Sequence, residues 1–204
     1  MTKQIPDIVV GRLPRYLQAL EHMQKDGFMT TSSKELGANL GISAAQIRKD
    51  LSQFGGFGKQ GMGYSIQSLI NQLRSILHVN QSWKLALVGI GDLGNALARY
   101  QGFTSRGFHI VLAFDIDPEK IGGKIGNIEI MDAAKIAEEV RKNDVKIAML
   151  TVPSTAAQNI AVELVKGGVL AILNYAPISL SLPDHVHVEY VDPIVKLQHM
   201  TFYL

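Results

Sequence analysis

A glycine pattern in the middle of the chain constrains the fold more than any other feature. The stretch WKLALVGIGDLGNALARY places an apolar segment, the pattern Gly89-x-Gly91-x-x-Gly94 and a helical periodicity in immediate succession. In a dinucleotide-binding α/β unit the first glycine allows a tight turn, the second lets the backbone approach a pyrophosphate, and the third lets the helix pack closely on the strand. The phosphates would lie at the helix N-terminus, where free N–H groups and the helix dipole favour negative charge.

An acidic residue follows at the spacing that such a unit requires. The next apolar segment, HIVLAFD, ends at Asp115, which is 21 residues after Gly94. A carboxylate there would accept hydrogen bonds from the adenosine ribose and repel the 2′-phosphate of NADP, so the pattern favours NAD. Asp117 is a competing candidate, and an aspartate that merely ends a strand is the third interpretation.

The remainder of the chain alternates strand and helix patterns. Apolar segments recur at KIAMLTVP and VLAILNYAP, on either side of a helical stretch over 154–166. This alternation predicts a doubly wound parallel sheet, whose ligands bind beyond the carboxyl ends of the strands. The candidate cofactor-binding residues are therefore Gly89, Ile90, Gly91, Asp92, Leu93, Gly94, Tyr100, Asp115, Ile116, Thr151, Val152, Pro153, Asn174, Tyr175, Ala176 and Pro177.

Two short helices are predicted ahead of the glycine pattern. Ser32-x-x-Glu35 and Ser43-x-x-Gln46 read as capping boxes, the first opening a helix through Leu40 and the second a helix to about Phe54. Only the turn LGIS separates them. The pair predicts a helix-turn-helix, whose second helix enters the DNA major groove.

The second of these helices has a core face and a polar face. Ala44, Ile47 and Leu51 fall at helical spacing and are expected to face the core. Polar or small residues on the other face are the candidate DNA contacts, namely Ser43, Ala45, Gln46, Arg48, Lys49 and Ser52. The glutamine suits a base edge, and the two cations suit phosphates or guanine. An exposed polar face on a purely structural helix is the alternative.

A glycine-rich segment follows the predicted second helix. FGGFGKQGMGY carries five glycines in eleven residues, with Lys59 and Gln60 at its centre. It predicts a tight β-hairpin that approaches a DNA backbone or minor groove, which makes Lys59 and Gln60 further candidate DNA contacts. A helix-turn-helix with such a hairpin is a winged helix, and an amphipathic helix over 65–80 would connect it to the glycine pattern.

Charge and composition narrow the function classes. Residues 1–83 hold nine Lys/Arg and five Asp/Glu, whereas residues 84–204 hold eleven and thirteen. The basic excess favours a nucleic-acid-facing N-terminal part, with a solvated basic surface as the alternative. Cysteine is absent, which excludes thiol chemistry and leaves no metal site expected. No apolar run approaches about 18 residues and the start lacks a signal-peptide core, so we expect a cytoplasmic protein with no membrane partner.

Catalytic residues do not accompany the dinucleotide pattern. None of the six histidines is expected at the end of a sheet strand, where a substrate would meet a nicotinamide, and no length is left for a substrate domain. We therefore predict a protein that is not an enzyme. An NAD-dependent oxidoreductase with an appended helical domain is one alternative, and a DNA-binding protein that uses its α/β domain only as a dimerisation scaffold is another.

The C-terminal segment predicts a dimer. VDPIVKLQHMTFYL begins with Asp192 as an N-cap and Pro193 in the first helical turn, and continues with seven apolar residues that must be buried. The helix could dock on its own domain or be exchanged with a second subunit, and exchange would create the two-fold symmetry that a palindromic operator requires. The predicted domains are 1–83 (winged helix), 84–190 (dinucleotide-binding) and 191–204 (dimer arm).

Several motifs, taken together, resemble those of the Rex family of redox-sensing transcriptional repressors. They are RLPRY, AQIRKDLSQFGGFGKQGMGY, GIGDLG, AFDIDP, LTVP, NYAP and the closing VD, and they span nearly the whole chain. The resemblance implies a homodimer with winged-helix domains, Rossmann domains that bind NADH and NAD⁺, and a domain-swapped C-terminal helix. It also implies repression of respiration and fermentation genes when NADH is scarce and release of the operator when NADH binds.

The resemblance assigns roles to individual residues. It assigns Arg48 and Lys49 to DNA, and the segment 89–94 with Asp115 to the dinucleotide. Tyr100 and Asp192 are assigned to a contact between subunits that differs between the two states of the dimer.

Three positions depart from the family pattern. Gln60 stands where the wing usually has Arg or Lys, Gln18 where the first helix commonly has Arg, and Pro193 where a bulkier apolar residue follows the aspartate. Gln60 predicts weaker DNA binding by the wing. The other two bear on the coupling near Tyr100 and Asp192.

Overall fold

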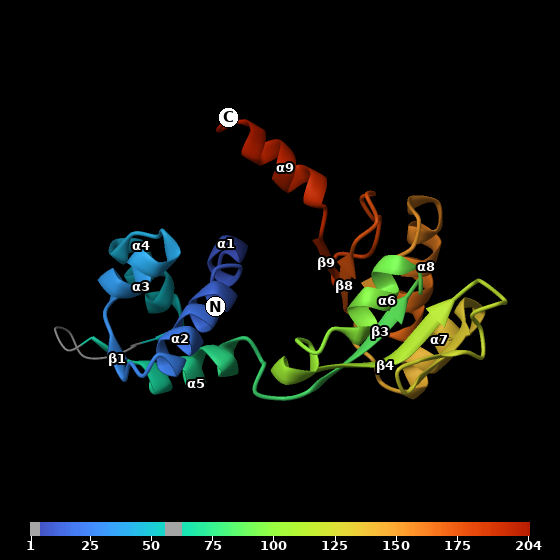
Figure 1. The fold of residues 1–204 in the computed structure, drawn as a ribbon, viewed down its shortest axis with the longest axis horizontal. Helices are drawn as coiled ribbons and strands as arrows, with labels where there is room; N and C mark the ends of the chain where they lie inside the picture. Colours follow the sequence, from blue (N-terminus) through green and yellow to red (C-terminus); the bar gives the residue numbers. More distant parts are fainter. Residues whose placement is uncertain (1–4, 56–62) are drawn as a thin grey trace. The chain divides into compact units, whose positions relative to one another are not determined.

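The computed structural model describes residues 5–55 and 63–204 of the chain. It contains two compact units, Met1–Gln81 and Ser82–Leu204 (Figure 1). Each unit has its own apolar core. The predicted division at residues 83 and 190 into three domains stays a prediction.

The N-terminal unit is built from helices around one core. Its helices are α1 (Asp7–Val10), α2 (Leu13–Lys25), α3 (Ser33–Leu40), α4 (Ala44–Leu51) and α5 (Ile66–Ile76), with a 3-10 turn at Ser52–Phe54. The apolar faces of these helices share the core, whose fully buried side chains include Leu13, Leu20, Leu36, Ile47 and Leu73. Each helix has a single apolar stripe, and this stripe faces the core.

The helix-turn-helix forms at α3 and α4. Ser32 and Glu35 make a complete capping box at the start of α3, and Gly41 ends that helix in the left-handed conformation with φ of 66°. Ser43 caps α4 by accepting a hydrogen bond from the backbone N–H of Gln46. The predicted second capping box is wrong in its other half, because the Gln46 side chain donates to Asp50 one turn along the helix.

The predicted wing lies largely outside the described residues. Strand β1 (Thr30–Thr31) pairs antiparallel with β2 (Tyr64–Ser65), and α5 begins directly after β2. Lys59 and Gln60 fall in the segment 56–62, which is not described.

The C-terminal unit is a Rossmann-type sheet. Its strands are β3 (Trp83–Val88), β4 (Phe108–Asp115), β5 (Lys124–Ile125), β6 (Ile128–Asp132), β7 (Ile147–Leu150), β8 (Ala171–Asn174) and β9 (His187–Tyr190), in the sheet order β5-β6-β4-β3-β7-β8-β9. All neighbours pair in parallel except β5, which is antiparallel to β6. The parallel strands therefore follow the doubly wound order 3-2-1-4-5-6, in which the order reverses between β3 and β7.

Helices cover the two faces of this sheet unequally. On one face, α7 (Ile136–Lys142) and α8 (Ser154–Gly167) pack on alternate strand residues such as Ala86 and Val88. On the other face, Leu85 and Leu87 pack with apolar residues that directly follow β3 or belong to α6 (Asp92–Arg99). The second face also carries apolar side chains that are only partly buried, among them Phe103, Phe108, Ile110 and Leu173.

The sequence analysis assigned no element between Asp115 and Lys146. The structure has β5, β6, a 3-10 turn at Ala133–Lys135 and α7 there. Ile128 and Ile130 alternate in β6, and Ala133, Ile136 and Val140 lie at helical spacing, but each pattern covers only a few residues.

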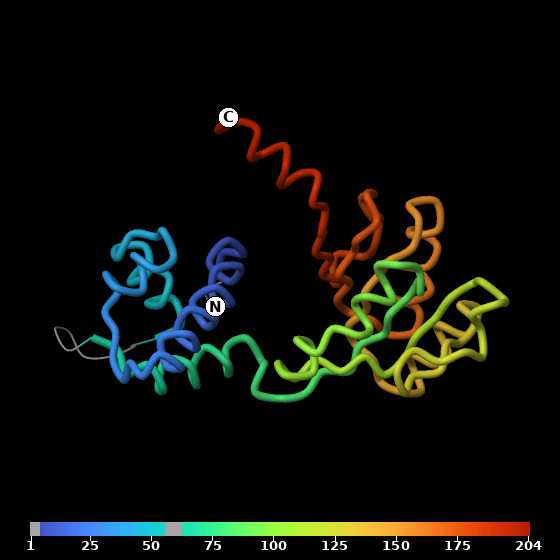
Figure 2. The backbone as a smooth tube through the Cα atoms, viewed as in Figure 1, coloured from blue at the N-terminus to red at the C-terminus, as the bar shows by residue number. Residues whose placement is uncertain are grey.

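The C-terminal helix α9 (Pro193–Thr201) begins as predicted, but it is exposed in the single chain. Asp192 caps it by accepting from the backbone N–H of Ile194, and Pro193 occupies its first turn. Figure 2 shows the backbone leaving β9 and continuing as α9. None of its residues is buried, and the exposed fractions of its apolar side chains run from 55% at Leu197 to 60% at Met200. Leu204, which follows the helix, is fully exposed. Within the described ranges, no helix is both long enough and apolar enough to cross a membrane.

Candidate dinucleotide and DNA sites

The glycine loop lies at the point where the strand order of the sheet reverses. It connects the end of β3 to α6, next to the end of β7. Gly89 has φ of 92°, and a Cβ there would meet the Thr151 carbonyl and the Val152 side chain. A Cβ on Gly94 would collide with the Gly89 carbonyl oxygen. The first and third glycines therefore let strand, turn and helix pack without a gap.

Gly91 differs from the other two glycines. A Cβ at Gly91 would meet nothing within 4 Å, and the residue is exposed. Gly91 is also the N-cap of α6, and it supplies no side-chain hydrogen bond to the first turn. Open space in front of uncapped helix N–H groups is what an incoming phosphate needs.

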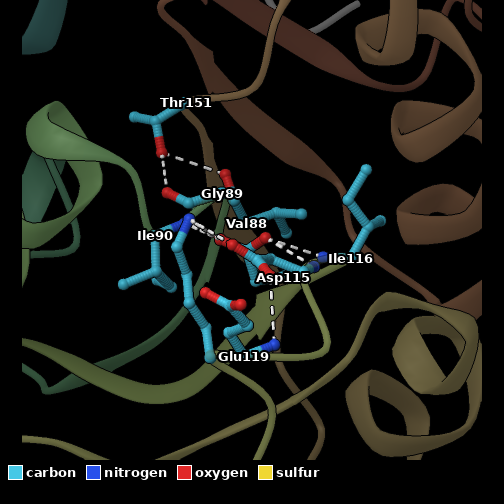
Figure 3. Close-up of polar contacts among 9 residues, drawn as sticks. Val88, Gly89, Ile90, Asp115, Ile116, Glu119 and Thr151 are labelled. Atoms are coloured by element: carbon cyan, nitrogen blue, oxygen red, sulfur yellow. Dashed lines mark hydrogen bonds and ion pairs between the residues drawn. The ribbon is translucent and has the colours of Figure 1, made fainter.

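Asp115 holds the glycine loop in place from the end of β4. Its Oδ2 accepts from the backbone N–H of Ile90 at 2.7 Å, and its Oδ1 accepts from those of Ile116 at 2.8 Å and Asp117 at 3.0 Å (Figure 3). Only 6% of the residue is exposed. Burial by itself would raise its pKa, but the backbone donors and the Lys120 charge outweigh burial, so the pKa of Asp115 lies below its usual value. The carboxylate is therefore ionised at neutral pH.

Lys120 limits the access of a ribose to the Asp115 carboxylate. The ammonium group lies 3.4 Å from Asp115 Oδ2 and 3.5 Å from Asp117 Oδ2, on a side chain that is 38% exposed. Three backbone N–H groups and this cation occupy the acceptor positions of the Asp115 carboxylate. A ribose hydroxyl would have to displace Lys120 or bind the more exposed Asp117. Lys120 was not predicted as part of the site, because in the sequence it looks like an ordinary surface lysine.

Thr151 connects β7 to the loop from the other side. Its Oγ1 lies 2.7 Å from the Gly89 carbonyl oxygen and 2.9 Å from that of Val88, and it donates to this pair (Figure 3). Asp115 and Thr151 therefore bond the N–H and the C=O of the same peptide unit, the one between Gly89 and Ile90. Val152 is half-buried and Pro153 is exposed at the start of α8.

Hydrogen bonds of the Asn174 side chain hold the conformation of the segment 174–177. Asn174 is 1% exposed, and its amide donates to the carbonyls of Ala176 and Ile178 while accepting from the Ala176 N–H. This side chain forms the turn after β8, so its polar atoms are already used. Tyr175 is half-buried, and burial raises its pKa.

Tyr100 and Asp192 make separate contacts within the chain. Tyr100 ends α6, is 55% exposed and stacks edge-to-face on Phe103 at 5.3 Å between ring centroids. Asp192 caps α9. Among the contacts of the described residues within one chain, none joins the two.

The outward face of α4 carries the predicted cations. Ala45, Arg48, Lys49 and Ser52 are exposed. The Arg48 guanidinium donates to Ser33 Oγ at 2.9 Å, across the turn from α3. Lys49 has no ion-pair partner within residues 5–55 and 63–204, which leaves its charge available. Both cations therefore suit contacts with phosphate.

A buried polar cluster lies on the inward side of the same helix. Asp50 is 1% exposed and accepts four hydrogen bonds. Arg12 bonds both carboxylate oxygens, from Nε at 2.6 Å and Nη2 at 2.8 Å, while Tyr16 OH reaches Oδ2 at 2.6 Å and Gln46 Nε2 reaches Oδ1 at 2.7 Å. Burial acts to raise the pKa of Asp50, but the hydrogen bonds from Arg12, Tyr16 and Gln46 lower it below the usual value. Burial and the bond to Asp50 raise the pKa of Tyr16 to about 12.

The sequence analysis missed this cluster. It placed Gln46 fully outward, whereas the side chain is half-buried and bonded to Asp50. The signal was an aspartate at a position where helical spacing points toward the core, four residues after a glutamine.

Comparison with known proteins identifies the family. A curated protein of Chloroflexus aggregans, named "Redox-sensing transcriptional repressor Rex", is 49% identical over 98% of this chain and 95% of its own length. A protein of the same name from Carboxydothermus hydrogenoformans is 44% identical over 98% of this chain and 96% of its own. The chain belongs to the Rex family.

Two family models match parts of the chain. The model described as "Putative DNA-binding protein N-terminus" matches residues 4–52. The model described as "CoA binding domain" matches residues 80–178. The Rex relatives are named transcriptional repressors and not enzymes, which removes the support for the oxidoreductase alternative.

Solved structures of another Rex protein share the whole fold. RSP in complex with β-NAD⁺ and operator DNA is 38% identical, with a TM-score of 0.93 over 98% of this chain and 93% of that one. RSP in complex with β-NADH is 36% identical, with a TM-score of 0.90 over 98% and 94%. The predicted fold class and the predicted family are thereby confirmed.

Proposed function

We propose that this chain is a homodimeric repressor that binds a palindromic operator when NADH is scarce and releases it when NADH binds. The observation that carries the proposal is the similarity, over 98% of the chain, to a Rex repressor solved with NAD⁺ and operator DNA and also with NADH. A protein that acts on operator DNA works in the cytoplasm, and we assign the chain to that compartment.

The glycine loop would hold the dinucleotide. The open space at Gly91 and the uncapped first turn of α6 fit a pyrophosphate, and Asp115 or Asp117 would take the ribose. Exposed apolar side chains flank this region at Leu93 and Ile116, where they could cover an adenine. NADH and NAD⁺ differ by a hydride and a charge on the nicotinamide ring, so the protein must read that ring and leave it unchanged.

To respond to the redox state of the nucleotide, the dimer must have two arrangements that bind NADH with different affinities. If NADH binds the arrangement that releases DNA more tightly, a coupling of about 1–3 kcal/mol changes operator affinity roughly 5- to 150-fold. Tyr100 and Asp192 are the proposed contact between subunits. The exposure of Tyr100 leaves its hydroxyl accessible to a partner chain.

The dimer would bury the apolar side chains of α9. This helix has no buried residue in the single chain, and the α6 face of the sheet has apolar side chains that are only partly covered. A helix exchanged between two chains would cover both surfaces at once. Exposed apolar patches of this kind mark interaction sites.

The DNA contacts would come from α4 and the wing. Ser43, Ala45, Gln46, Arg48, Lys49 and Ser52 are proposed in the major groove, and Lys59 and Gln60 at the wing. The first turn of a recognition helix contacts base edges, and basic residues further along meet phosphates.

The test is operator binding as a function of both nucleotides. A palindromic duplex selected from a random library by the full chain would be labelled, and its dissociation constant measured by fluorescence anisotropy. We expect saturating NADH to weaken binding roughly 5- to 150-fold, and NAD⁺ to reverse that effect by competition. Unchanged affinity at saturating NADH would leave a DNA-binding protein whose α/β domain is a scaffold.

A further inference from the structure

The buried cluster at Asp50 determines which polar atoms of the Gln46 side chain remain without a hydrogen bond. An ionised carboxylate only accepts hydrogen bonds, so the side-chain group of Gln46 that lies 2.7 Å from Asp50 Oδ1 must be its NH₂. Arg12 and Tyr16 occupy the other acceptor positions of Asp50. The carboxylate is therefore saturated, and the amide of Gln46 has one orientation available.

This orientation leaves a defined pattern on the recognition helix. One N–H of Gln46 is used by Asp50, and the second N–H and the carbonyl Oε1 are left. Within residues 5–55 and 63–204, no group donates a hydrogen bond to that oxygen. Gln46 is the third residue of α4, in the turn of a recognition helix that meets base edges.

One donor beside one acceptor is selective among bases. In the major groove adenine presents N7 as an acceptor and N6–H₂ as a donor, whereas guanine presents two acceptors, N7 and O6. The unused N–H and oxygen of the half-buried Gln46 complement adenine, and the oxygen would repel guanine O6. If the amide could turn freely, this distinction would weaken.

We propose that Asp50 is a positioning residue for base recognition: its carboxylate oxygen Oδ1 fixes the Gln46 amide so that the recognition helix selects adenine at one position of each operator half-site. The proposal rests on the proposed function, because it requires that α4 enters the major groove of an operator. Asp50 itself does not contact DNA.

The experiment is binding-site selection from a random duplex library with the full-length chain in NAD⁺, followed by anisotropy on the selected duplex and on its single-base-pair variants. Gln46→Ala should relax the preference at one base pair per half-site. That base should be adenine, and its replacement by guanine should cost the wild-type protein roughly 5- to 150-fold in affinity. Asp50→Asn should relax the same base pair, because the neutral amide that replaces the carboxylate can present either a donor or an acceptor to Gln46.

Tyr16→Phe is the matched control. It removes one hydrogen bond from the same carboxylate but leaves the bond between Oδ1 and Gln46. It should lower the melting temperature and keep the adenine preference. If Asp50→Asn does not fold by circular dichroism, Arg12→Met combined with Asp50→Leu removes both charges and fills the space, which proteins tolerate far better than a single unpaired charge. That double variant should fold and show the relaxed preference.

The outcomes separate the inference from the function on which it rests. Retention of the adenine preference in a folded variant that lacks Asp50 overturns the proposal, as does a Gln46→Ala protein with unchanged preferences or with relaxation at a base other than adenine. Equal relaxation by Tyr16→Phe would point to general loosening of the domain and would also overturn it. If the wild-type chain selects no sequence at all, the proposed function fails instead.

Discussion

The carboxylate of Asp115 accepts a hydrogen bond from the backbone N–H of Ile90 at 2.7 Å, and this bond ties the end of β4 to the glycine loop. The residue expected to bind a ribose is thus also a structural part of the glycine loop. A change at Asp115 therefore acts on the shape of the loop and on any ligand contact together.

Asp115→Ala should weaken NADH binding at least tenfold and lower the stability of the C-terminal unit by about 1–3 kcal/mol, because buried N–H groups lose their acceptor. Asp117→Ala should leave stability nearly unchanged, since its side chain is 38% exposed. Isothermal titration with NADH and thermal unfolding of both variants check this. Unchanged nucleotide affinity in a folded Asp115→Ala protein, with loss in Asp117→Ala, would move the ribose assignment to Asp117.

Gly91→Ala and Gly94→Ala should separate ligand binding from folding. A methyl at Gly91 enters open space, so the protein should keep its melting temperature but bind NADH more weakly. A methyl at Gly94 collides with the Gly89 carbonyl and should destabilise the unit by roughly 1–3 kcal/mol, as overpacking does. The same titration and unfolding measurements apply, and full NADH affinity in Gly91→Ala would argue against a pyrophosphate at that position.

Arg48→Ala and Lys49→Ala should each weaken operator binding and reduce the slope of log affinity against log salt by about one, as loss of a phosphate contact does. NADH affinity should not change. Lys142→Ala removes an exposed cation of the C-terminal unit and is the matched control. A salt slope that is unchanged in all three proteins would place both α4 cations away from the phosphates.

The dimer should depend on the apolar residues of α9. Leu197→Asp places a charge on a side chain that is 55% exposed in the single chain and that the proposed exchange would bury. We expect it to shift the mass measured by analytical ultracentrifugation from that of two chains toward that of one, and to weaken operator binding in parallel. Gln198→Asp adds the same charge at the neighbouring position, and equal dissociation by both variants would show a general charge effect.

Acid should destabilise the N-terminal unit through Asp50. Because the folded-state pKa is lower than the usual 3.8, the stabilisation is fully present above that value and is lost as the pH falls through the lowered one. Asp50→Asn should be less stable by about 3–5 kcal/mol at pH 7, since Arg12 loses its buried partner. The free energy of unfolding of this variant, measured with urea, should also fall less steeply than that of the wild type below about pH 4. Asp26→Asn, at the exposed end of α2, should follow the wild-type curve.

The sequence by itself determined the elements that have strong local signals. The glycine pattern gave the turn after β3 because only glycine fits where a Cβ would strike the neighbouring backbone, and Ser32 with Glu35 gave the start of α3 because a capping box is local. The chain also carried enough motifs to indicate its family. Short elements such as β5 and α7 were not predicted, because each spans too few residues for its pattern to be distinctive.

The tertiary structure alone decided how distant polar side chains are used. Arg12 and Asp50 are 38 residues apart, and nothing in the local sequence says that they meet. Likewise, only the packed sheet brings Ile90 to Asp115 and Thr151 to Gly89. Local propensity follows from neighbouring residues, whereas the partner of a buried polar group is set by whichever side chain the packed fold brings within hydrogen-bonding distance, because such a group cannot be left without one.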